Sequence, residues 1–97
     1  MNTSATYELV EVLRETRAFL ARPDNHFDWC HWDIATDALL EFDALVTQIE
    51  AGDPSGRHGL DMLFGPTGSI QEVSISSGWG EEFLTLAARF DAAIQKV

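Results

Sequence analysis

Two long segments of the sequence repeat apolar side chains every three or four residues, the period of an amphipathic helix. Residues 5–21 place the apolar side chains on one face and most of the charged ones on the other. Thr3 or Ser4 can cap this helix, and Pro23 prevents it from continuing much beyond Arg22. Residues 29–51 repeat the pattern, and Gly52 is a natural stop. The chain therefore has to pair at least two long helices.

The C-terminal part of the chain predicts two further helices. Residues 80–96 carry an apolar stripe, with Glu81 and Glu82 near the positive end of the helix dipole and Lys96 near its negative end. Residues 69–77 are ambiguous, because 73–76 alternate like a strand while the start of the segment resembles a capping box. No second strand is evident to pair with it. We therefore expect a short helix that Gly78 closes.

The stretch between these helices is rich in turn-forming residues. Residues 53–59 predict a loop, and the short apolar run 60–64 predicts one helical turn packed on the core. The sequence thus predicts an all-α fold, a compact bundle of three long helices plus one or two short helices. Residues 1–97 are expected to form a single domain.

The charge of the chain restricts its partners. Its 97 residues include 16 Asp and Glu but only 6 Lys and Arg, a formal net charge of −10. Nucleic-acid phosphates and anionic membranes would be repelled, so we expect neither as a partner. A basic protein would be attracted. The single cysteine, the absence of a visible secretory signal and the lack of a membrane-spanning apolar run predict a cytoplasmic protein.

Residues 25–33, NHFDWCHWD, gather more reactive side chains than any other stretch. A helix start explains most of them. Asp28 would be the N-cap and accept hydrogen bonds from backbone N–H groups of the first turn. Phe27 before the cap and Trp32 in the first turn would then pack together as a hydrophobic staple.

A metal site is the alternative for the same stretch. Zinc needs about four ligands aimed at one point, but neighbours such as Cys30 and His31 diverge by about 100° on a helix. The spacing with His26 and Asp28 matches neither paired Cys-x-x-Cys ligands nor a His-Glu-x-x-His helix, and no orienting group is visible for a Cys30 nucleophile. We expect no metal, no cofactor and no catalytic residue here.

Two groups of residues remain as candidate binding surfaces. The three tryptophans, Trp29, Trp32 and Trp79, either form an aromatic mini-core or, with His31, line a groove for a ligand or a partner helix. The acidic row Asp33, Asp37 and Glu41 is either a solvated helix face or a contact surface for a basic protein.

Residues 63–92, LFGPTGSIQEVSISSGWGEEFLTLAARFDA, together with 27–33, FDWCHWD, resemble small uncharacterised bacterial proteins with no assigned activity. The resemblance covers 37 of the 97 residues. It implies a shared fold and carries over no functional residue.

Three kinds of function are compatible with these patterns. The favoured one is a non-enzymatic interaction module that binds a basic protein or a second copy of itself. The others are a binder of a small apolar or metal ligand near the tryptophans, and an enzyme of unrecognised type.

Overall fold

The computed structural model describes residues 3–27, 32–66 and 68–96, and every regular element in them is an α-helix. The described part of the chain contains five helices: α1 (Thr3–Leu20), α2 (Ala35–Glu50), α3 (Pro54–Phe64), α4 (Ser69–Ser77) and α5 (Gly80–Ile94). The predicted all-α bundle of three long and two shorter helices is confirmed.

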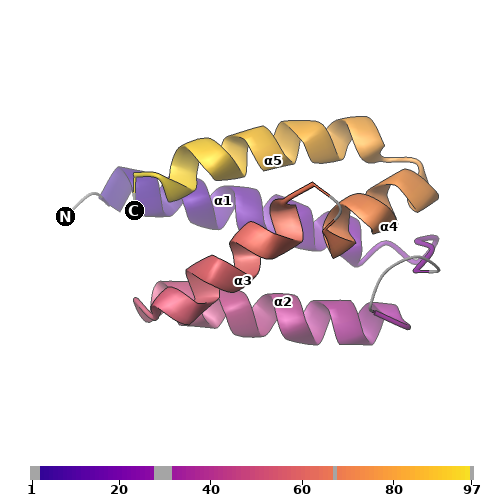
Figure 1. The fold of residues 1–97 in the computed structure, drawn as a ribbon, viewed down its shortest axis with the longest axis horizontal. Helices are drawn as coiled ribbons and strands as arrows, with labels where there is room; N and C mark the ends of the chain where they lie inside the picture. Colours follow the sequence, from indigo (N-terminus) through magenta and orange to yellow (C-terminus); the bar gives the residue numbers. More distant parts are fainter. Residues whose placement is uncertain (1–2, 28–31, 67, 97) are drawn as a thin grey trace.

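The helices pack as a bundle in which the shorter α3 and α4 lie against the three long helices (Figure 1). Helices α2 and α5 both run antiparallel to α1 and lie on either side of it (Figure 1). Helix α3 packs mainly against α2, and α4 packs against α5. The core is apolar and includes the large side chains of Trp32, Phe42, Trp79 and Phe90.

Helix α3 begins at Pro54, six residues before the helical turn predicted at 60–64. The prediction of a loop over 53–59 was therefore wrong. Asp53 is the N-cap, and its side chain accepts a 2.9 Å hydrogen bond from the backbone N–H of Ser55. Pro54 occupies the first helical position, where its missing N–H costs nothing. The same Asp-Pro-Ser-Gly letters that are typical of a turn thus also start a helix.

The glycines of α3 allow it to lie very close to α2. A Cβ atom added to Gly56 would stand 2.8 Å from the backbone oxygen of Leu45 and 2.9 Å from the backbone nitrogen of Ile49. One added to Gly59 would collide with the Leu45 side chain at 2.5 Å. These glycines therefore serve helix packing, although in the sequence they look like loop residues.

Helix α2 begins at Ala35, six residues later than predicted. Ile34 is the cap residue, with extended backbone angles and no side-chain cap hydrogen bond. Trp32 precedes the helix, so it is not a first-turn partner of Phe27; the proposed cap, Asp28, lies outside the described residues. Trp32 is instead 98% buried, and its indole N–H donates to Glu41 at 3.4 Å. Trp32 is thus a core residue ahead of α2 and not part of its first turn.

The other helix boundaries lie within two residues of the predicted ones. Helix α4 spans the predicted 69–77, and Gly78 closes it with a left-handed φ of 85°. Its N-cap is Gly68 and it has no side-chain cap hydrogen bond, so the predicted capping box, with Ser69 as the cap, was wrong. Helix α1 ends at Leu20, ahead of Pro23. Its first residue is Thr3, so Thr3 and Ser4 lie within the first turn, and the prediction that one of them is the N-cap was wrong. Helix α5 ends two residues before the predicted 96.

Asn25 ties the end of α1 to the corner between α4 and α5. Its side-chain N–H group donates to the backbone oxygens of Phe19 and Leu20, at 2.7 and 3.1 Å, and so satisfies two carbonyls at the helix end. Its side-chain oxygen accepts from the indole N–H of Trp79 at 2.9 Å. The Trp79 ring packs on Phe19 with centroids 4.9 Å apart.

Replacement of Gly56 by alanine tests the close approach of α3 to α2. Alanine favours a helix by about 0.5–1 kcal/mol over glycine, so propensity alone predicts stabilisation. We expect the opposite, a loss of about 1–3 kcal/mol, because the new methyl group meets backbone atoms of α2. Urea unfolding measures the free energy. His58→Ala, at an exposed site of α3, should stay close to wild type. A more stable Gly56→Ala would contradict this account.

The variant Asn25→Ala tests the tie between α1 and the Trp79 corner. It leaves the buried indole N–H and two helix-end carbonyls without this partner. The expected loss of unfolding free energy is about 1–3 kcal/mol, measured by urea unfolding followed through tryptophan fluorescence. The exposed neighbour Asp24→Ala serves as the control, and equal stability of the two variants would count against the tie.

Candidate functional site

The predicted acidic row lies only partly on one helix. Asp37 and Glu41 are one turn apart on α2, whereas Asp33 lies in the bend that precedes it. The side chains of Asp33 and Asp37 are exposed, and Glu41 is half-buried with its carboxylate against Trp32. Asp33 and Asp37 thus present exposed carboxylates, whereas the carboxylate of Glu41 also binds the buried Trp32 side chain.

Two large apolar side chains stand among these acids, and the sequence analysis missed both. Leu40 is 67% exposed on the outer side of α2, and Ile34 is 57% exposed at its cap. Leu40 falls outside the apolar stripe of the helix and directly follows Leu39, which packs on the core. That offset from the stripe was the available signal. Exposed aliphatic side chains surrounded by carboxylates are typical of a surface that meets another protein.

The described members of the tryptophan group belong to the core. Trp79 is 99% buried and stacks on Phe19, and Trp32 is buried at the start of α2. The guanidinium of Arg22 also contacts Phe19 and lies 4.1 Å from the centroid of its ring. Trp29 and His31 lie outside the described residues. The two described indoles present almost no surface to a ligand.

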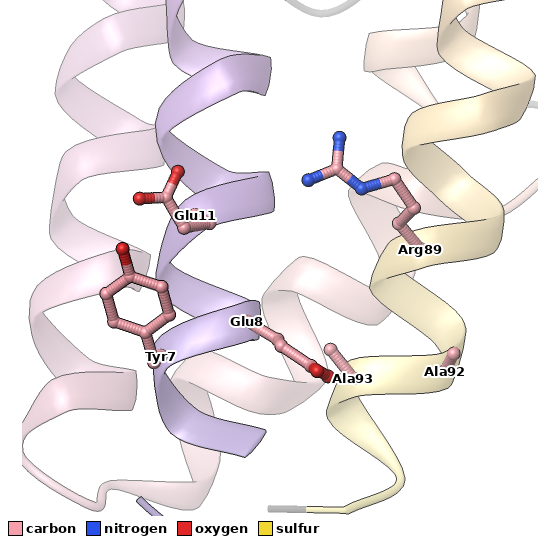
Figure 2. A pocket seen from close by; sticks show the side chains of 6 residues that line it. All are labelled: Tyr7, Glu8, Glu11, Arg89, Ala92 and Ala93. Atoms are coloured by element: carbon pink, nitrogen blue, oxygen red, sulfur yellow. The ribbon is translucent and has the colours of Figure 1, made fainter. Parts of the chain in front are cut away.

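A groove of about 380 Å³ lies between α1 and α5. Tyr7, Glu8 and Glu11 form its α1 wall, and Arg89 and two alanines form its α5 wall (Figure 2). The guanidinium of Arg89 reaches across toward α1, where it binds the Glu15 carboxylate with two hydrogen bonds of 2.9 and 2.6 Å. At the other end, Lys96 lies 3.9 Å from Glu8. Two of the three charged side chains that line the groove, Arg89 and Glu8, thus pair with charged residues beside it.

Helix α1 carries a second two-point ion pair on its other side. Arg17 binds both oxygens of Asp43 on α2, at 2.7 and 3.0 Å. The hydrogen bonds from Arg17 hold the pKa of Asp43 below its ordinary value, and those from Arg89 do the same to the pKa of Glu15. These two exposed pairs connect α1 to both of its neighbours, α2 and α5.

The charges are separated along the chain. Residues 23–88 contain twelve Asp and Glu and a single cation, Arg57, a formal charge of −11. This segment includes α2, α3 and α4. The other five Lys and Arg lie on α1 with its following turn, or in residues 89–96. Within the described ranges every carboxylate is exposed or half-buried, so this charge faces solvent.

Neither a metal centre nor a membrane segment emerges from the described ranges. No three His, Cys, Asp or Glu side chains among them are grouped as metal ligands would be. None of the five helices combines the length and the apolar character needed to cross a bilayer. Cys30 and His31 lie outside this part of the chain.

Comparison with known proteins leaves the fold and the surface as the basis for a functional argument. No family model, curated protein or solved structure matches the chain.

The Arg17–Asp43 pair predicts how stability depends on pH. A carboxyl whose pKa is lower in the folded than in the unfolded protein adds stability above its unfolded value, near pH 4, and loses it as pH falls through the folded value. At pH 7 we expect Asp43→Asn to be less stable by only roughly 0.2–1 kcal/mol, because both partners are about half exposed.

Urea unfolding of both proteins between pH 7 and pH 2 measures this difference, which should shrink below about pH 4. Asp61→Asn, a change at an exposed carboxylate of α3, is the control and should match wild type throughout. A gap that stays constant down to pH 2 would show that Asp43 acts through something other than its charge.

Proposed function

We propose that this protein is a non-enzymatic interaction module that binds a basic protein segment through the outer side of α2. The observation that carries the proposal is the separation of charge, with a formal −11 on residues 23–88 and the exposed apolar side chains of Ile34 and Leu40 among the acids. Electrostatic complementarity would steer a cationic partner toward this half of the molecule.

The mixture of charge and apolar surface favours a particular kind of partner. Carboxylates alone would hold any polycation loosely, whereas a buried apolar anchor adds affinity and fixes the position of the partner. Leu40 stands within one helical turn of both Asp37 and Glu41. The partner that fits is an amphipathic segment with Lys or Arg beside leucine-like side chains.

Neutral variants of the acidic row test this proposal. The probe is a fluorescently labelled amphipathic helical peptide that combines lysines with leucines, and fluorescence anisotropy measures its dissociation constant. We expect the triple variant Asp33→Asn, Asp37→Asn, Glu41→Gln to weaken binding about tenfold, since it removes three nearby charges. Leu40→Ala should weaken it at unchanged charge. Oligolysine of the same charge should bind less tightly than the peptide and be insensitive to Leu40→Ala.

A matched control separates a defined surface from overall charge. The triple variant Glu81→Gln, Glu82→Gln, Asp91→Asn removes the same number of charges from exposed sites on α5. It should bind the peptide nearly as well as wild type. Equal weakening by both triple variants, or no response to Leu40→Ala, would refute a binding surface on α2.

A further inference from the structure

A second groove, of about 210 Å³, lies between α1 and α2 and has an unusual balance of charge. Its floor is apolar, with half-buried Val10 and Val46 above the buried Leu13 and Phe42. Its α1 wall carries Arg14 and Arg17, and its α2 wall carries Asp43 and Glu50. The charged side chains that line it are therefore two positive and two negative, on a chain whose formal charge is −10.

Two of these four charged side chains are already paired, and two are not. Arg17 and Asp43 bind each other across the groove. Arg14 and Glu50 are exposed, stand on opposite walls, and have no ion pair with any described residue. The groove thus has one unpaired cation and one unpaired anion on opposite sides of its apolar floor.

We infer that this groove is the contact between two copies of the chain, related by a two-fold axis that runs along the groove. Two molecules of charge −10 repel each other, so they can meet only where each surface is neutral or complementary. The α1–α2 groove meets that condition, whereas the outer side of α2 near Asp37 does not. The inference concerns a different surface from the proposed partner site and does not depend on it.

The geometry of the two helices places the unused charges correctly for such an axis. A two-fold axis parallel to the groove sets α1 of one copy over α2 of the other without a shift along the helices. The Arg17–Asp43 pair puts residues 17 and 43 at the same level, and the helices are antiparallel (Figure 1). Arg14, about 4.5 Å along α1, is then level with residue 46.

The second copy's Arg14 would therefore lie over α2 between Asp43 and Glu50. Symmetry repeats the contact, so each dimer contains two such pairs, with Val10 and Val46 of both copies between them. The face formed by α1 and α2 is about 24 Å long and about 20 Å wide. Its area is smaller than the roughly 800 Å² that each partner buries in a standard interface. The dimer is therefore weak and reversible.

Charge reversal provides the test, with sedimentation equilibrium at 5–500 µM protein as the measurement. Wild type should associate reversibly to a dimer. Arg14→Glu and Glu50→Arg should each raise the dissociation constant at least about tenfold, since each puts like charges together at two symmetric places. The double variant Arg14→Glu, Glu50→Arg should restore the dimer. Circular dichroism checks that these exposed substitutions leave the helices intact.

The two single variants separate a specific pairing from general repulsion. Arg14→Glu makes the formal charge −12 and Glu50→Arg makes it −8, so repulsion alone would weaken one dimer and strengthen the other. The proposed contact requires both to weaken. Arg57→Glu and Asp61→Arg make the same changes on the exposed side of α3 and should leave the dimer within about threefold of wild type.

Three results would overturn the inference. They are a monomeric wild type over the whole concentration range, single reversals that do no more than the α3 controls, and a double variant no better than the single ones. Each can occur while the peptide still binds to the outer side of α2, so failure of the dimer and failure of the proposed function are distinguishable.

Discussion

The close contact between α2 and α3 is the constraint on which the rest of the structure depends. Gly56 removes a side chain where the backbone of one helix meets the backbone of the next, and Gly59 makes room for Leu45. With α3 seated there, its buried Leu60, Leu63 and Phe64 reach the core, and the Phe64 ring stacks on Phe90 of α5 at 4.2 Å. A short helix thereby joins two long ones that are distant in sequence.

Helix α1 organises the opposite side of the molecule. Its buried face, including Leu9, Val12 and Leu13, supplies the core, while Arg17 and Glu15 reach in different directions to α2 and α5. Exposed ion pairs of this kind add little stability, so the apolar face holds the bundle together. These ion pairs nevertheless determine which charged side chains along the two grooves beside α1 are paired and which are not.

That pattern connects the two proposals. Five of the six cations lie on α1 or α5 or directly after them, and four of these five meet a carboxylate or an aromatic ring. The exposed carboxylates of Asp33 and Asp37 form no ion pair with a cation of the described residues, so they are available to a basic partner. The α1–α2 groove is the border between these regions, and at that border the charges balance. A dimer through the groove would leave the outer sides of both α2 helices open to partners.

The periodicity of apolar residues determined the class of fold, because burial of a three-to-four-residue stripe requires helices packed on one another. It also located α1, α4 and α5 closely, since Pro23 and Gly78 end helices through their own backbone restrictions. The sequence could not show that Asp53 and Pro54 start a helix, because the same residues start turns and the choice depends on the α2 backbone that Gly56 meets. Nor could it place the start of α2, because the cap residue Ile34 makes no side-chain cap hydrogen bond and so gives no capping signal in the sequence. Helical spacing placed Asp37 and Glu41 one turn apart on α2, but it failed at Asp33, which precedes the helix. The exposure of Leu40 and the pairing of the charges follow only from the packing, which decides which side chains reach each other.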